Sequence, residues 1–102
     1  MMFIRNEISE EEILLQVKGT LDSEAAEQFQ KEISSIAAGD HKIITLDLSE
    51  VPSINSTCIG KILLLRKSLT EQDRSIRISG CSDALYNTFQ LIDLDKRINI
   101  DH

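Results

Sequence analysis

The sequence predicts a small α/β domain with a mixed, mostly parallel sheet of four to five strands packed with three to four helices. Two observations support this fold class. Strand-forming runs alternate along the chain with segments whose apolar residues recur at helical spacing, a pattern typical of strand-helix-strand units with short right-handed crossovers. The 102 residues fit one hydrophobic core, and no linker rich in Pro, Gly or Ser divides them. Residues 1–102 are therefore expected to form a single domain.

The N-terminal part of the chain reads as two strands followed by a helix. Residues 3–8 and 13–17 predict strands that are joined by the acidic turn 9–12. Asp22 or Ser23 can cap the helix that follows. The apolar side chains of this helix recur at helical spacing and are Ala25, Ala26, Phe29, Ile33 and Ile36.

The end of this helix and the next strand are marked by single residues. Gly39 stands where helices commonly end with a left-handed residue. The next strand, residues 42–48, is almost continuously apolar from Ile43 onward, as expected for a strand that is covered on both faces. Asp47 interrupts this run and is expected to satisfy backbone groups near the strand's end. Pro52 cannot donate a backbone hydrogen bond, so the sheet ladder should stop before it.

A short polar corner joins this strand to a second helix. Asn55 or Ser56 can cap that helix, because the first backbone N–H groups of a helix lack intrahelical partners. The same N–H groups favour anions, so a hydroxyl at this position is a place where a phosphate could act as a switch. Ile54, just before the cap, should return to the core.

The second helix is predicted to have two different faces. A broad apolar arc can face the sheet and comprises Cys58, Ile59, Ile62, Leu63, Leu65 and Leu69. Ser56, Gly60, Leu64 and Lys67 fall together on the opposite side. A glycine costs roughly 1 kcal/mol of helix propensity. A docking partner would explain this face, although single exposed leucines are also ordinary on protein surfaces.

The C-terminal part repeats the alternation of strand and helix. Residues 75–79 alternate apolar and polar side chains and predict a strand. Ser82 with Asp83 can open a third helix, and residues 97–100 predict a last short strand. The predicted buried face of the third helix carries Leu85, Phe89 and Ile92.

The segment LDLSEVPSINSTCIGKILLL, residues 46–65, carries a resemblance to a known family. It resembles the STAS family, the fold of bacterial anti-sigma factor antagonists, whose pattern reads LDLS, apolar residues, DS(S/T)GLG and an apolar helix. The stretches VKGTLDSEAAEQF before it and RSIRISGCSDALYNTFQLIDLDKRINI after it look like the flanking strands and helices of that family. The resemblance covers nearly the whole chain and implies a single STAS-like domain.

The resemblance also implies a function in partner switching. In the family, the first hydroxyl after the acidic corner residue is phosphorylated by a partner that is both anti-sigma factor and serine kinase. That position matches Ser56, with Thr57 as the second choice. Phosphorylation would release the partner, and a phosphatase would restore binding. ATP and magnesium belong to the kinase, so no cofactor is implied for this chain. The implied partner-binding residues are Asn55, Ser56, Thr57, Gly60, Leu64 and Lys67.

Two residues depart from the family pattern. Asn55 stands where the family usually has Asp, and Cys58 stands where it usually has Gly. These departures leave open an alternative, a STAS scaffold or ligand-binding signalling module that is never phosphorylated. Cys58 near a helix start could also act as a redox sensor. Its phase on the helix favours a buried, inert thiol.

Composition limits the other function classes. The formal net charge of −6 and the scattered basic residues argue against nucleic-acid binding and favour positively charged partners.

No apolar run approaches the roughly 20 residues of a membrane span, and the N-terminus lacks a signal-peptide pattern, so a cytoplasmic protein is expected. Cys58 and Cys81 share no metal-ligand spacing with the histidines, which predicts free thiols. The free protein is expected to be a monomer.

An enzyme is the remaining rival class. The sequence contains no GxxxxGK(S/T) phosphate loop, no GxGxxG fingerprint and no GxSxG nucleophile motif. A catalytic role for Ser56 would require a base. Neither His41, at a strand entrance, nor His102, at the far end of the sequence, suggests one. The sequence therefore favours a binding protein over an enzyme.

Overall fold

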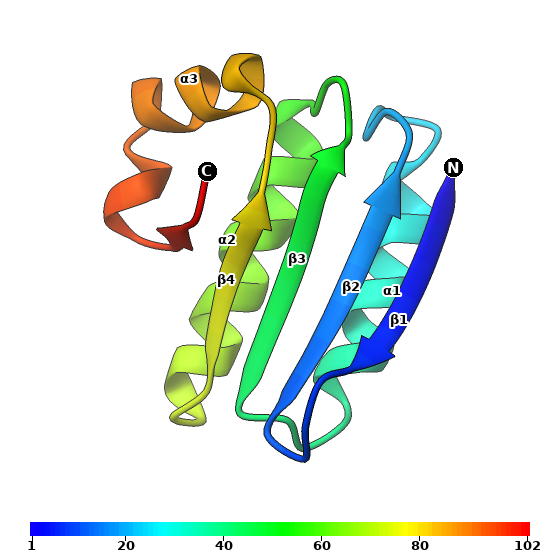
Figure 1. Cartoon of the computed structure of the whole chain (residues 1–102), viewed down its shortest axis with the longest axis vertical. Helices are drawn as coiled ribbons and strands as arrows, with labels where there is room; N and C mark the ends of the chain where they lie inside the picture. Colours follow the sequence, from blue (N-terminus) through cyan, green and yellow to red (C-terminus); the bar gives the residue numbers. More distant parts are fainter.

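The computed structural model describes residues 1–102. Five strands, three α-helices and one 3-10 helix, η1, follow one another along the chain (Figure 1). Their bounds are β1 Met2–Glu7, β2 Glu12–Lys18, α1 Ala26–Ala37, β3 Ile43–Glu50, α2 Ser56–Glu71, β4 Ser75–Gly80, α3 Asp83–Leu91, η1 Leu94–Lys96 and β5 Asn99–Ile100. This order of elements confirms the predicted α/β fold class.

All five strands form one sheet in the spatial order β1-β2-β3-β4-β5. β1 pairs with β2 in antiparallel orientation, and every other neighbouring pair is parallel. The sheet is therefore mixed and mostly parallel, as predicted. β3 is its central strand, and the loops that follow β2 and β3 lie at the same edge of the sheet (Figure 1).

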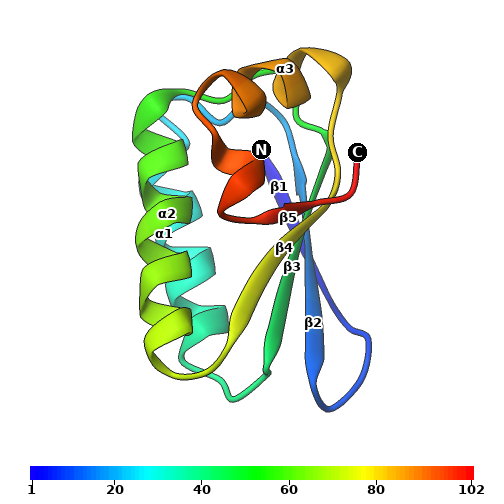
Figure 2. The same ribbon diagram turned by 90° about the vertical axis from the view of Figure 1, so that its left-hand side faces the viewer.

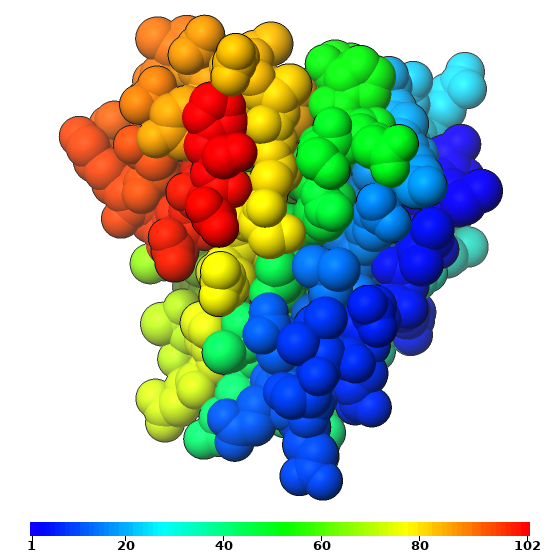
Figure 3. All heavy atoms as spheres, in the orientation of Figure 1, coloured from blue at the N-terminus to red at the C-terminus, as the bar shows by residue number.

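The two long helices, α1 and α2, cover the same face of the sheet (Figure 2). The expectation that the strand at 42–48 is covered on both faces is therefore wrong, and the strands are visible across the open face (Figure 3). Thr45 on this face is nevertheless only 2% exposed. It lies between Leu14 and Arg77 in the sheet register. Its hydroxyl donates a hydrogen bond of 2.7 Å to the Glu12 carboxylate. Residues of the neighbouring strands therefore bury Thr45, although no layer of helices covers this face.

The hydrophobic core lies between the sheet and the helices. Its two phenylalanines, Phe29 on α1 and Phe89 on α3, are fully buried, and the rest of the core is mainly aliphatic. Burial of one large apolar side chain contributes about 1.5–3 kcal/mol before the entropy of ordering is subtracted. The buried residues of the three central strands are Leu15, Val17, Ile44, Leu46, Leu48, Ile76 and Ile78, together with Thr45 and Gly80. None of the helices is long and apolar enough to cross a membrane.

The ends of α1 differ from the prediction. The helix begins at Ala26 without a side-chain cap. Asp22 caps the preceding turn instead, since its carboxylate accepts a hydrogen bond of 3.0 Å from the N–H of Ala25. Gly39 does not adopt the left-handed conformation, and Gly19 is the single glycine with positive φ. The helix therefore needs another partner for its last carbonyl groups.

Arg74 supplies that partner from the loop before β4. Its Nη1 donates a hydrogen bond of 2.9 Å to the carbonyl of Ala37, the last residue of α1. Its Nε donates one of 2.8 Å to the carbonyl of His41. A guanidinium presents several donors in a fixed plane, so one side chain can bind both carbonyls. Arg74 thus ties the loop after α1 to the loop after α2.

We expect Arg74→Met to lower the free energy of unfolding by about 2–3 kcal/mol, because two backbone carbonyls lose a charged donor. Urea denaturation followed by circular dichroism measures this change. Arg97→Met is the control, since Arg97 is exposed in the segment before β5. A loss no larger than that of the control would mean that Arg74 does not hold the two loops together.

The third helix and the last strand are shorter than predicted. α3 ends at Leu91, so Ile92 lies past its last turn and is exposed rather than buried. Leu94, from η1, contributes to the core instead. Asp93 between them adopts a left-handed conformation with φ of 59° and turns the chain into η1. The predicted last strand is confirmed as β5.

Candidate partner-binding site

Two side chains bond to the backbone where β3 gives way to α2. Asp47 accepts hydrogen bonds of 3.0 and 2.7 Å from the N–H and the hydroxyl of Ser49, which confirms its predicted role. Asn55 has an extended backbone, and its Oδ1 accepts a hydrogen bond of 2.9 Å from the N–H of Cys58. Asn55, and not Ser56, is therefore the cap of α2.

Ser56 and Thr57 are the first two residues of α2, and both are exposed. Because Asn55 provides the cap, the hydroxyl of Ser56 is not needed for helix initiation. The unpaired N–H groups of the first helical turn give this position a positive electrostatic potential. The site therefore offers a hydroxyl that is free to react, in surroundings that favour a negative charge.

A second loop, residues 19–25, lies against this corner. Leu21 pairs with Ile54 in an isolated parallel bridge. The N–H of Asn55 donates a hydrogen bond of 2.9 Å to the carbonyl of Leu21. The side-chain amide of Asn55 also donates one of 3.5 Å to the hydroxyl of Ser23. The two loops thus form one continuous surface around the start of α2.

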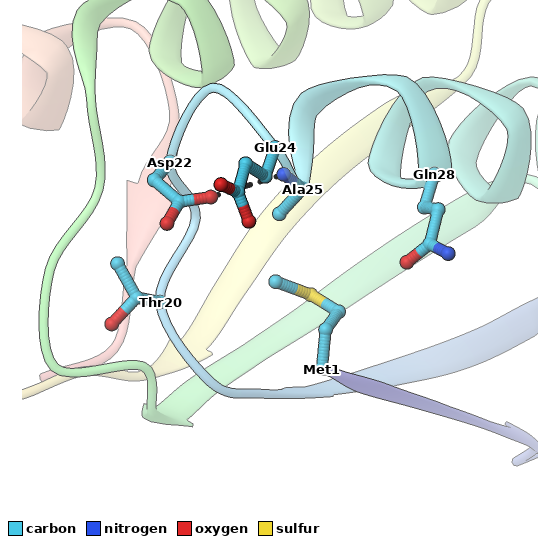
Figure 4. A pocket seen from close by; sticks show the side chains of 6 residues that line it. All are labelled: Met1, Thr20, Asp22, Glu24, Ala25 and Gln28. Atoms are coloured by element: carbon cyan, nitrogen blue, oxygen red, sulfur yellow. Dashed lines mark hydrogen bonds between the residues drawn. The ribbon is translucent and has the colours of Figure 1, made fainter.

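Residues 19–25 were not among those predicted for the site. The signal for this loop was present, because loops that follow neighbouring parallel strands meet at the same edge of a sheet. A hollow of about 410 Å³ lies on this loop, and Figure 4 shows the side chains that line it. The side chains of Asp22 and Glu24 line it, so its acidic character disfavours phosphate. The position suited to a phosphate is therefore the start of α2.

The outward face of α2 carries Ser56, Gly60, Leu64 and Lys67, as the helical phase predicted. The side chain of Leu64 is 68% exposed, and Lys67 is also exposed. A Cβ added to Gly60 would meet no atom within 4 Å, so internal packing does not require a glycine there. The face contains an apolar anchor and a glycine that the fold itself does not explain, although its role in binding stays a prediction.

Both cysteines are buried free thiols. Burial raises the pKa of the Cys58 thiol above its ordinary value, opposed by Lys61 and reinforced by Asp22. Burial and the neighbouring Asp83 raise the pKa of Cys81. The helix start that could lower the pKa of Cys58 is outweighed by desolvation. This agrees with the prediction of an inert, buried residue.

We expect both thiols to react slowly with Ellman's reagent at pH 7 in the native protein and rapidly in urea. A raised pKa keeps each thiol protonated at pH 7. The contribution of the protonated thiols to folding stability persists below about pH 9 and declines as the pH rises through the folded-state pKa. Reaction rates between pH 7 and pH 10 measure the effect. A native rate at pH 7 equal to that in urea would support a reactive thiol instead.

The two histidines lie away from the start of α2. His41 contacts the carboxylate of Glu7 at 2.7 Å, in the connection between α1 and β3. His102 stacks on Tyr86 of α3, with ring centroids 4.3 Å apart. Neither is placed to remove a proton from Ser56, so the geometry offers no histidine base for this hydroxyl.

Comparisons with known proteins agree with this architecture. Residues 4–100 match the family described as "Mlab, STAS domain". The anti-sigma-B factor antagonist of Listeria monocytogenes serovar 1/2a is 28% identical over 84 residues, which cover 82% of this chain and 74% of that protein. The protein of the same name from Listeria innocua serovar 6a is equally similar.

Several solved structures have the same fold. An anti-sigma factor antagonist from Mycobacterium paratuberculosis gives a TM-score of 0.87 at 17% identity, over 97% of this chain and 83% of that chain. The anti-sigma factor antagonist SpoIIAA in its unphosphorylated form gives 0.82 at 20% identity, over 97% and 87% of the two chains. Its phosphorylated Bacillus form gives 0.75 at 20% identity, over 97% and 90%. Because the family match spans nearly every residue, the chain belongs to the STAS domain family.

Proposed function

We propose that this protein is an anti-sigma factor antagonist in a partner-switching pathway. The observation that carries the proposal is the exposed Ser56 at the start of α2, with an exposed leucine, Leu64, about two turns further along the same helix face. The similarity to the Listeria anti-sigma-B factor antagonists supports it. Unphosphorylated protein binds an anti-sigma factor through the outward face of α2 and thereby frees the sigma factor.

Phosphorylation of Ser56 releases the partner. A phosphate adds about 1.5 to 2 negative charges at pH 7. The N–H groups and dipole at the helix start stabilise such a charge by about 0.3–1 kcal/mol, so the domain need not rearrange. The same charge pressed against an apolar or acidic partner surface costs several kcal/mol, and each 1.4 kcal/mol weakens binding about tenfold.

Other proteins complete the proposed cycle. The anti-sigma factor is itself the serine kinase and supplies ATP and magnesium, and a phosphatase resets the switch. Thr57 is the second candidate acceptor, because it follows Ser56 and is also exposed. The antagonist acts in the cytoplasm as a monomer between binding events.

The alternative function is a STAS scaffold or ligand-binding module that is not phosphorylated. Asn55 favours this alternative, because the family usually has a carboxylate at this position. In the structure Asn55 retains the capping hydrogen bond but adds no negative charge beside Ser56. The two functions differ in one measurable respect, since a scaffold binds its partner equally well with and without ATP.

The test is calorimetric titration of this protein with each anti-sigma factor kinase that its own host organism encodes, purified in turn. We expect one of them to bind without ATP and to be released after incubation with ATP and magnesium. Binding that ATP does not change would establish the scaffold alternative. The absence of binding to all of them would refute the antagonist function, and substrate turnover by the protein alone would point to an enzyme.

We expect Gly60→Ala to raise the stability and lower the affinity for that anti-sigma factor. The added methyl group meets no atom of the protein and improves helix propensity by about 1 kcal/mol. If the partner packs closely on Gly60, the methyl group should weaken binding about tenfold. Thermal unfolding and calorimetry measure the two effects. Unchanged affinity would show that the partner does not approach this glycine.

A further inference from the structure

α1 and α2 pack side by side on one face of the sheet (Figure 2). A groove of about 300 Å³ lies between them and is lined by residues of both helices. Ile33 and Ala37 of α1 and Leu64 and Leu65 of α2 provide its apolar lining. At one end Lys61 donates a hydrogen bond of 3.3 Å to the side-chain oxygen of Gln30, which joins the two helices. The groove is therefore a built feature of the helix pair and has an apolar floor.

The charge of this region is opposite to that of the whole chain. The formal net charge of the protein is −6, yet no acidic residue lines the groove. On α2 the basic residues are Lys61, Arg66 and Lys67, and Glu71 is the single acidic one. Lys61 and Lys67 form no ion pair within the protein, whereas Lys18, Lys31 and Lys96 do. Lys61 lines the groove, whereas Lys67 lies outside this lining on the outward face of α2. One cation in the groove is thus available to a partner.

We propose that this groove binds an acidic, amphipathic helix of the partner protein. The groove runs between residues 30 and 37 on one side and 61 and 68 on the other, which is about 10 Å or two helical turns. A helix of that length presents apolar residues at positions i and i+4 to the floor, and a carboxylate on its flank reaches Lys61. The overall charge favours basic partners, but the local charge of α2 decides the chemistry here.

This inference rests on the proposed function for the identity of the partner. Leu64 belongs both to the outward face of α2 and to the groove, so the two surfaces are continuous. Ser56 begins the same helix about one and a half turns before Lys61. An acidic segment in the groove would be repelled by a phosphate on Ser56, so the switch and the groove act on the same bound partner.

The direct test uses two synthetic peptides and the isotopically labelled full chain. Each peptide is an amphipathic helix of about 14 residues with leucines at i and i+4 spacing, one with glutamates at all other positions and one with lysines. We expect the glutamate peptide to shift the amide signals of residues 30–37 and 61–68 in nuclear magnetic resonance titrations. Lys61→Glu should weaken its binding about tenfold or more, and Leu64→Ala should weaken it about threefold to tenfold. Leu91→Ala, at an exposed leucine of α3, should leave it unchanged.

Several results would contradict binding of an acidic helix in the groove. The inference fails if the two peptides bind equally, if neither binds at about 5 mM, or if the shifts centre outside the groove. It also fails if the free protein dimerises in sedimentation experiments and Leu64→Ala removes the dimer, since a second copy would then occupy the groove. Titration of the cognate anti-sigma factor separates the two proposals. If ATP releases the anti-sigma factor and Lys61→Glu does not change its affinity, the proposed function is supported and the groove is ruled out as the binding site.

Discussion

Leu64→Asp is expected to weaken binding of the anti-sigma factor about a hundredfold or more. The leucine side chain is 68% exposed in the free protein, and burying such a side chain in an interface contributes about 1.5–3 kcal/mol. An aspartate at this position would lose that contribution and would place an unpaired charge in the interface. Calorimetric titration measures the loss of affinity.

The folded protein should tolerate this substitution, because Leu64 faces solvent and lies outside the buried core. Leu91→Asp is the matched control, since Leu91 is 86% exposed on α3. We expect both variants to unfold at nearly the temperature of the unmodified protein. Affinity lost equally in both variants, or unchanged in Leu64→Asp, would place the partner on another surface.

Ser56→Ala is expected to abolish the release of the anti-sigma factor by ATP. In the unmodified protein, phosphorylation should weaken binding about a hundredfold, which corresponds to about 2.7 kcal/mol. The alanine variant cannot accept the phosphate. It should also fold normally, because the cap of α2 comes from Asn55. The affinity before and after incubation with kinase, ATP and magnesium gives the result.

Thr57→Ala controls for the neighbouring hydroxyl, which is also exposed at the start of α2. It should be released by ATP as the unmodified protein is. If release instead disappears in Thr57→Ala and persists in Ser56→Ala, the acceptor is Thr57. Release that persists in both variants would move the switch to another residue.

Local patterns predicted most of the fold. The helical spacing of Phe29, Ile33 and Ile36 and the Ser82 cap of α3 correspond to the structure. The predictions failed where distant contacts decide. Gly39 does not need the left-handed conformation because Arg74, far along the chain, bonds to the carbonyl of Ala37. No pattern near Gly39 carries that information.

The strand at 42–48 illustrates a second limit of sequence patterns. A continuous apolar run indicates burial on both sides, but burial can come from neighbouring strands as well as from a second layer of helices. Thr45 is buried on the open face because Leu14 and Arg77 flank it in the register. The pattern predicted the burial of this strand and not its cause.

The candidate site was predictable where it depends on one helix. The phase of α2 placed Gly60, Leu64 and Lys67 on one face, and the structure agrees. The choice between Asn55 and Ser56 as the cap was not predictable, since both side chains can serve. The contribution of residues 19–25 was missed because it depends on the pairing of Leu21 with Ile54 across the sheet edge.

Mass spectrometry of the protein purified from its own host tests directly whether Ser56 is phosphorylated. Intact mass reports whether a phosphate is attached, and peptide fragmentation locates it. We expect a phosphate on Ser56 in part of the population and none at this position in the Ser56→Ala variant. A protein that carries no phosphate in the host, and gains none with the cognate kinase and ATP, would contradict the switch and establish a constitutive binding module.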